Sequence, residues 1–268
     1  MSWKSFDHEN NCWFEAKISF YDFSVLKTTN DKQAEYLTKL FKGAVRLNSD
    51  FLSKWSGFKV QTKLDFPLNW GLGSSSTLTH LVAKWADVNP LLLHFEVSNG
   101  SGYDVACAGV DLPITYQIVD DQINFTEIDI EWPFAHQLYF VHLNRKQSSE
   151  AGLKYYLKTG KGRKQLAKDL SSITEEIIDC ATLNSFEKLL KTHEELVSKS
   201  LTLSPMGKEF FSDYWGAIKS LGAWGGDFVI ATSDRSPEDT KAYFKKKGYN
   251  TFLQFSELFD FQRVISKV

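Results

Sequence analysis

The fold is decided by the stretch "NWGLGSSSTLTHLVAKW", residues 69–85, where a glycine-bracketed turn leads through three serines into an amphipathic helix. Gly71 and Gly73 permit backbone conformations and close approaches that a Cβ would prevent. The next residues place hydroxyls where a helix has unpaired N–H groups and the positive end of its dipole: Ser74, Ser75 and Ser76. The stretch therefore predicts either an anion site best suited to phosphate or a serine-capped helix start.

Outward from this stretch, the apolar periodicity predicts strands and helices that mix without strict βαβ alternation. This pattern favours an α+β fold with two halves, which we place at residues 1–140 and 141–268. The helix of the opening stretch is expected to bury the face that carries Leu78, Leu81, Val82 and Trp85. Strands are predicted within 11–26, 58–64, 114–119, 123–130, 137–143, 227–232 and 250–255, and helices over 30–47, 186–201 and 237–247.

Composition narrows the class of protein. The chain has 268 residues and 43% hydrophobic residues, enough for a sizeable core. The 31 Lys and Arg against 33 Asp and Glu give no basic surplus, which argues against nucleic acid or an anionic membrane as a partner. Three distant cysteines and a charged start without an apolar signal core or membrane span predict a reduced, soluble, cytoplasmic protein.

A second glycine turn, "SNGSGYDVACAG" at residues 98–109, presents Asp104 at the start of an apolar, small-residue stretch. A carboxylate held in this way can accept the proton of a substrate hydroxyl, as the base of a kinase does. An Asp that caps a short helix is the alternative interpretation.

Four further features each carry two interpretations. The glycines of "IKSLGAWGGDFVIAT", residues 218–232, suit close approach to a ligand or a tight loop. Arg145 and its neighbours in "LNRKQSSEAG", residues 143–152, suit phosphate oxygens or a solvated loop. His193 lies on an apolar helix face and is either a ligand or a core residue. Glu96 is either a Mg²⁺ ligand or part of a solvated helix face.

In their order along the chain, these motifs resemble the GHMP small-molecule kinases, and most closely the mevalonate and phosphomevalonate kinase branch. The family signature P-x-G-A-G-L-G-S-S is matched by Pro67 with Gly71 to Ser75, and S-G-x-D by Ser101, Gly102 and Asp104. "KTHEELVSKSLTLSP" is similar to the N-H-x-L-L helix and the L-G-V-S turn after it, and "SLGAWGGDFVIA" to the G-A-G-G-G-G motif. The resemblance runs from about residue 35 to residue 235.

The resemblance implies an N-terminal α+β domain with a left-handed βαβ unit and a ferredoxin-like C-terminal domain, with ATP and Mg²⁺ between them. It implies that Asp104 is the catalytic base and that Ser75 reaches the metal, for which Glu96 is the candidate carboxylate. The ATP phosphates would lie on Gly71, Leu72, Gly73, Ser74, Ser75 and Ser76. Lys146 and Ser148 would face the charged end of the substrate, with His193, Gly222, Ala223 and Gly225 near the substrate pocket.

The chain departs from the family pattern in three places. Nothing like the family's G-K-x-x-L-x-G-E strand, whose lysine assists the catalytic Asp, precedes Trp3, so we expect the sequence to begin inside the first domain, roughly 40 residues late. Asn69 and Trp70 stand where the family has Gly-Ala. Trp224 and Asp227 replace glycines of the last motif. We expect this bulky side chain and this acid to weaken the steric and electrostatic fit of a substrate or phosphate there.

Three functions follow from these observations. The first is an ATP-dependent kinase that phosphorylates a hydroxyl or a phosphate of a small, mevalonate-like metabolite. The second is a relative that binds a nucleotide or metabolite without catalysis, as the missing lysine strand and the altered glycines suggest. The third is a structural or interaction protein whose glycine loops serve only the fold.

Overall fold

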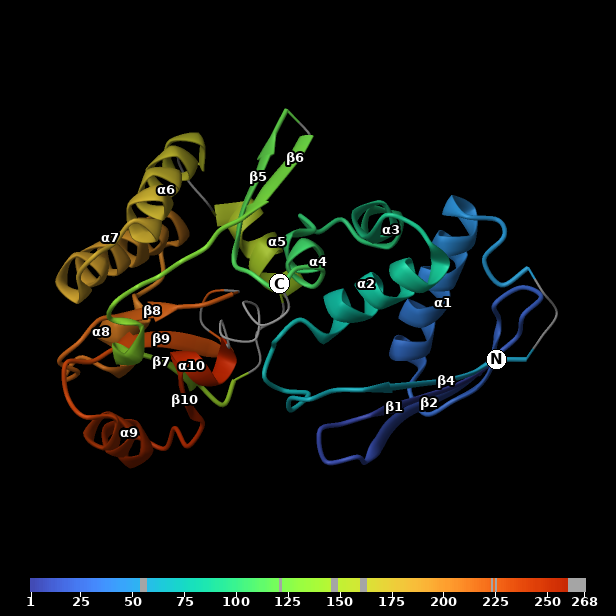
Figure 1. Ribbon diagram of the computed structural model, residues 1–268, viewed down its shortest axis with the longest axis horizontal. Coiled ribbons are helices and arrows are strands. Elements are labelled where there is room, and N and C mark those ends of the chain that lie inside the picture. Colours follow the sequence, from blue (N-terminus) through green and yellow to red (C-terminus); the bar gives the residue numbers. More distant parts are fainter. Residues whose placement is uncertain are drawn as a thin grey trace. The chain divides into compact units, whose positions relative to one another are not determined.

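The computed structural model describes residues 1–53, 57–120, 122–145, 149–159, 163–222, 224 and 226–259. The chain divides into two compact units, Met1–Ile128 and Asp129–Val268, and each has its own sheet (Figure 1). Each unit also has its own hydrophobic core. The predicted α+β class is confirmed. The expected boundary between residues 140 and 141 falls within β7 (Leu138–His142), a strand of the second unit.

The main sheet of the first unit has the strand order β3-β2-β1-β4. Its strands are β1 (Ser2–Phe6), β2 (Cys12–Ile18), β3 (Val25–Thr28) and β4 (Lys59–Lys63), with β1 antiparallel to β2 and parallel to β4. The sequence pattern did not predict β1, because one of its two inward positions is the polar Ser5. Ser5 is buried with its hydroxyl accepting hydrogen bonds from the Trp3 indole and the Thr62 hydroxyl, which removes the cost of burying it.

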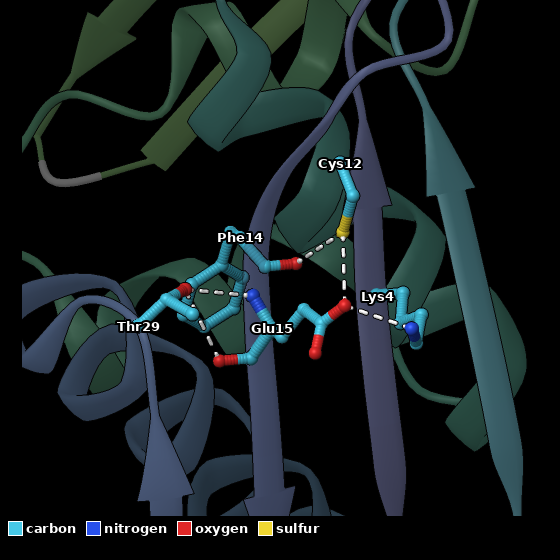
Figure 2. A network of polar contacts seen from close by, with 5 residues as sticks. All are labelled: Lys4, Cys12, Phe14, Glu15 and Thr29. Carbon is cyan, nitrogen blue, oxygen red and sulfur yellow. Dashed lines mark hydrogen bonds and ion pairs between the residues drawn. The ribbon is translucent and has the colours of Figure 1, made fainter.

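The outward side of this sheet carries a small polar network (Figure 2). Lys4 and Glu15 are directly paired across β1 and β2, and their side chains form an ion pair of 2.7 Å. The Glu15 amide donates to the Thr29 hydroxyl, and the Cys12 thiol donates to the Phe14 carbonyl oxygen. Because these groups are exposed, the network favours one strand register more than it adds to stability.

Four helices and a hairpin complete the first unit: α1 (Asp31–Leu47), α2 (Ser74–Ala86), α3 (Pro90–Val97), α4 (Tyr103–Cys107), β5 (Ile114–Val119) and β6 (Gln122–Glu127). The Asn30 side chain caps α1, whose apolar face packs against β2 and β3. Helices α2 and α3 pack on α1, so the sheet is covered on one face (Figure 1).

As predicted, Val82 of α2 is buried and Leu78 packs against the core, but the buried face as a whole differs from the expected one. It consists of Thr79, Val82, Ala83 and Ala86, whereas Leu81 is 51% exposed and Trp85 is 38% exposed. Small residues allow α2 to lie close to α1, and the Thr79 hydroxyl is paired with the Tyr36 hydroxyl at 2.7 Å. Hydrophobic spacing alone favoured the larger side chains and missed this polar contact.

The second unit has an antiparallel sheet of order β10-β7-β9-β8. Helices connect β7 to β8 and β9 to β10, which is the β-α-β-β-α-β arrangement of ferredoxin-like folds. The elements after β7 are α5 (Ser149–Thr159), α6 (Arg163–Ile178), α7 (Leu183–Leu201), α8 (Met206–Phe210), β8 (Ile218–Ser220), β9 (Phe228–Thr232), α9 (Pro237–Lys246), β10 (Phe252–Gln254) and α10 (Phe255–Leu258). None of the helices in the described part of the chain is long and apolar enough to span a membrane.

Candidate functional site

The glycine turn before α2 adopts a left-handed backbone. Gly71 has φ 67° and Gly73, the N-cap residue, has φ 76°. A Cβ on Gly73 would meet no atom within 4 Å, so glycine is needed here for its backbone conformation and not for space. The Trp70 amide donates to the Pro67 carbonyl at 3.1 Å, which tightens the approach to the turn.

The three serines occupy the first turn of α2. The prediction of a serine cap is wrong, because Gly73 is the N-cap residue and no side chain caps this helix. Within the described residues, the first amide of this helix with an acceptor is that of Thr77, which donates to Gly73, so the amides of Ser74, Ser75 and Ser76 remain available. The first turn also has no acidic residue. Unpaired amides at the positive end of a helix dipole suit a phosphate.

Asp104 is the second residue of the short helix α4, which Gly102 begins with φ 85°. The interpretation of Asp104 as the N-cap is therefore wrong. A Cβ on Gly102 would lie 3.0 Å from Leu91 Cδ2, so this turn needs glycine for both conformation and space. The close packing of the turn against α3 fixes the start of α4 and, with it, the backbone that carries Asp104.

The surroundings of Asp104 favour its neutral form. Burial raises the pKa of Asp104, while a hydrogen bond with Tyr103 and the charge of His94 act in the opposite direction. The β5–β6 hairpin supports the turn, since the Tyr116 hydroxyl donates to the Ser101 carbonyl at 2.5 Å and its ring contacts the Tyr103 ring edge to face. A half-buried carboxylate with a raised pKa on a braced turn has the character of a general base.

The two glycine turns lie on helices that contact each other. Helix α4 packs against α2, and Gly109, just after α4, lies so close to His80 of α2 that an added Cβ would be 2.6 Å from the imidazole Cε1. The first unit thus presents an open helix N-terminus and a half-buried carboxylate on neighbouring helices.

Glu96, the residue expected to hold a metal, is engaged elsewhere. Its Oε2 accepts from Arg46 Nε at 2.8 Å and lies 2.7 Å from Arg46 Nη2. The described residues contain no group of three or more His, Cys, Asp or Glu able to hold a metal ion. The hydroxyl of Ser75 is exposed in the first turn of α2, but these residues do not assemble a metal site around Glu96.

In the second unit, four predicted substrate residues lie outside the described part of the chain: Lys146, Ser148, Ala223 and Gly225. Gly222 has φ 62° with no atom within 4 Å of an added Cβ. His193 lies on α7, and its Nδ1 is buried without a hydrogen-bond partner. Burial, and then the charge of Lys219, lower the pKa of His193 to about 4, so this imidazole is neutral at pH 7.

Sequence reasoning missed Glu194, which is 2% exposed beside His193. Its carboxylate accepts from the Ser220 amide and hydroxyl and, at 3.1 Å, from the Trp224 indole. Its position offered a signal, because Glu194 falls four residues after Leu190 on the apolar face of the helix, where a charged residue needs partners.

Comparison with known proteins gives structural matches alone: no family model and no curated protein sequence matches the chain. The structural matches are members of the GHMP kinase superfamily, whose fold this chain has. Mevalonate kinase of Methanococcus jannaschii is 17% identical with a TM-score of 0.59, over 94% of this chain and 83% of that one. Galactokinase of Lactococcus lactis, complexed with galactose, is 13% identical with a TM-score of 0.59, over 96% and 79%. Mevalonate diphosphate decarboxylase of Enterococcus faecalis, in a study of ATP binding mediated by mevalonate diphosphate, is 16% identical with a TM-score of 0.51, over 87% and 79%.

Proposed function

We propose that this protein is an ATP-dependent kinase that phosphorylates a hydroxyl or a phosphate of a small metabolite. The observation that carries the proposal is the open N-terminus of α2 together with the half-buried Asp104 on α4, a helix that packs against α2. The fold shared with mevalonate kinase and galactokinase supports the same reaction class. The three cysteines, all free in the structure, support a reducing, cytoplasmic setting.

In this reaction the amides of Ser74 to Ser76 hold phosphate oxygens of ATP. For an alcohol acceptor, Asp104 takes the proton of the acceptor hydroxyl while the oxygen of that hydroxyl forms a bond to the γ-phosphorus. The bond between that phosphorus and the β,γ-bridging oxygen breaks, and ADP leaves with the electron pair. The raised pKa of Asp104 suits a group that must accept a proton and release it again.

Mg²⁺ enters the proposal only as the companion of the nucleotide phosphates, with the exposed Ser75 hydroxyl as the contact expected from the resemblance. Glu96, the carboxylate expected to hold the metal, is paired with Arg46 instead.

The acceptor is proposed to contact His193 and Gly222 of the second unit. On the resemblance alone, the acceptor is also proposed to contact Lys146, Ser148, Ala223 and Gly225. Mevalonate and galactose, named with the structural relatives, are the first acceptors to try.

A second candidate is a relative that binds a nucleotide or metabolite without catalysis. The ion pair between Glu96 and Arg46 favours it, because the carboxylate expected for the metal is already engaged.

Titration calorimetry with ATP and an ADP-release assay on a panel of alcohols and phosphorylated metabolites separate these candidates. Turnover of any acceptor that depends on Asp104 supports the kinase. Tight ATP binding without turnover on the whole panel supports the binding protein. Absence of nucleotide binding contradicts the kinase, and absence of both nucleotide and metabolite binding contradicts the binding protein as well.

A further inference from the structure

The half-buried imidazole of His94, on α3, lies against two glycines of the second glycine turn. An added Cβ on Gly102 would lie 3.5 Å from its Cδ2, and one on Gly100 would lie 3.3 Å from its Nε2. The same Nε2 is 3.2 Å from the Gly100 carbonyl oxygen. Because a carbonyl oxygen can only accept, Nε2 carries the proton and donates this hydrogen bond.

Helix α3, which carries His94, is fixed on the core of the first unit. Its Leu93 is fully buried, and an added Cβ on Gly43 of α1 would lie 3.0 Å from Leu93 Cδ1. The ion pair between Glu96 and Arg46 also joins α3 to α1. Because this packing locks the backbone under His94, the imidazole gives the glycine turn a fixed point of attachment.

The turn between α3 and α4 depends on side chains for its shape. It lies outside the helices and strands, and fixing a glycine backbone costs more conformational entropy than fixing that of any other residue. The Gly100 amide donates to the Ser98 hydroxyl at 3.1 Å, and the Tyr116 hydroxyl donates to the Ser101 carbonyl at 2.5 Å. With the bond from His94, the turn is held both by the helix before it and by the hairpin after it.

The position of the turn sets the position of Asp104. The Gly102 carbonyl accepts from the amides of Val105 and Ala106, each at 3.0 Å, and so begins α4. Asp104 lies two residues after Gly102, in the first turn of that helix. Burial raises the pKa of Asp104 and the charge of His94 opposes this change, so the imidazole is also within electrostatic reach of the carboxylate. A shift of the turn therefore moves the carboxylate.

We propose that His94 is a positioning residue for Asp104, whose Nε2–H holds the Gly100 carbonyl and thereby the glycine turn that presents the carboxylate. This inference rests on the proposed function, since it concerns the orientation of the base in that reaction. A general base must lie within hydrogen-bond reach of the proton that it takes, and a misplacement of about 1 Å can cost about 100-fold in rate. His94 therefore acts on kcat through Asp104, and ATP binding at the start of α2 does not depend on it.

The test replaces the imidazole of His94 with two amides of different reach. In H94Q the amide nitrogen stands near the place of Nε2 and can donate to the Gly100 carbonyl, whereas in H94N it is one methylene short. The exposed His8 of the same unit gives the matched controls H8Q and H8N. The variants are compared by ADP release with ATP and mevalonate or galactose, and by calorimetry with ATP. Hydrogen exchange of the Val105 and Ala106 amides reports the turn independently of turnover.

We expect H94N to lower kcat per ATP-binding site about tenfold or more, with the affinity for ATP unchanged. H94Q retains most of the wild-type kcat, and both variants of His8 retain all of it. Exchange of the Val105 and Ala106 amides becomes faster in H94N and stays close to wild type in H94Q. Because His94 acts through Asp104, H94N adds no further loss of kcat to D104N. A residue that served only the stability of the fold would reduce the amount of ATP-binding protein and leave kcat per site unchanged.

Should H94N fail to fold, H94L also lacks the donor, fills the space with an apolar side chain and carries the same test. An active wild type whose kcat per site is unchanged in H94N, or falls equally in H94N and H94Q, overturns the inference and leaves the kinase intact. Amide exchange that is unchanged in H94N, or a loss of kcat that multiplies with that of D104N, does the same. A wild type that binds ATP and phosphorylates no acceptor of the panel overturns the proposed function and this inference together.

Discussion

The two glycine turns of the first unit begin helices in the same way and differ in what surrounds them. Gly73 and Gly102 both serve as N-caps with a left-handed backbone, φ 76° and 85°, and neither helix start has a side-chain cap. A Cβ on Gly73 would face open space, whereas one on Gly102 would lie 3.0 Å from Leu91. The first turn is open, and the second is packed against α3.

This difference separates two tasks that a helix N-terminus can perform. The open turn before α2 leaves its amides for a ligand and has no acid of its own. The packed turn before α4 holds Asp104 in the first turn of the helix, where the dipole favours a negative charge although burial raises the pKa. One turn suits binding of an anion, and the other presents a base.

The largest effect is expected from D104N, which removes the base of the packed turn. We expect kcat to fall by about 100- to 10,000-fold, the usual range for a general base, with ATP affinity unchanged. Because the folded state raises the pKa of Asp104, ionisation costs stability at pH 7, so D104N should unfold at a higher urea concentration. The exposed Asp111 gives the matched control D111N. Wild-type turnover in D104N would contradict the assignment of the base.

The second prediction compares G73A with G102A. Both place a Cβ on a left-handed backbone, which costs about 1–2 kcal/mol, and G102A adds overpacking against Leu91, which costs a further 1–3 kcal/mol or so. Urea unfolding should therefore show the larger loss of stability for G102A. Equal losses would show that the second turn is not held by packing.

The third prediction concerns the open turn alone. In S75D a carboxylate competes for the amides at the start of α2, so calorimetry should show ATP affinity reduced about tenfold or more. The same charge interacts favourably with the helix dipole and should stabilise the fold by about 0.5 kcal/mol. S53D adds equal charge at an exposed residue outside α2 and serves as the control. Unchanged ATP affinity in S75D would show that ATP does not bind at this turn.

The smallest effect is a displacement of the pH–rate profile. Because burial raises the pKa of Asp104 above 3.8, the base becomes protonated at a higher pH than an exposed aspartate. The value of kcat/KM should therefore fall as the pH decreases, with its acid limb above pH 3.8. An acid limb at or below that value would show that the packed turn does not raise the pKa of Asp104.

Much of the fold could be predicted from periodicity. The helix expected over 30–47 and the strand expected over 227–232 correspond to α1 and β9. Strand β1 was missed because Ser5 interrupts its apolar alternation, and the buried face of α2 was misjudged because Thr79 and two alanines, not Leu81, meet the core.

The candidate site was predictable as motifs and not as contacts. The glycines and serines before α2 and the Asp of the second turn were identified by residue type and order. The hydrogen-bond partners of the site residues could not be identified in this way, because they are distant in the sequence. Arg46 and Glu96 are 50 residues apart, and Glu194 and Trp224 are 30 residues apart.

By itself the sequence determined where the two glycine turns lie, since glycine adopts a left-handed backbone without the strain of a Cβ and the amides of a first turn without acidic residues can meet an anion. Tertiary structure decided what each turn is for. Packing against Leu91 encloses one turn and leaves the other open, and burial, which depends on the whole fold, raises the pKa of Asp104 and fixes Glu194 against Trp224. Local geometry follows from local residues, whereas solvation and charge partners are properties of the assembled core.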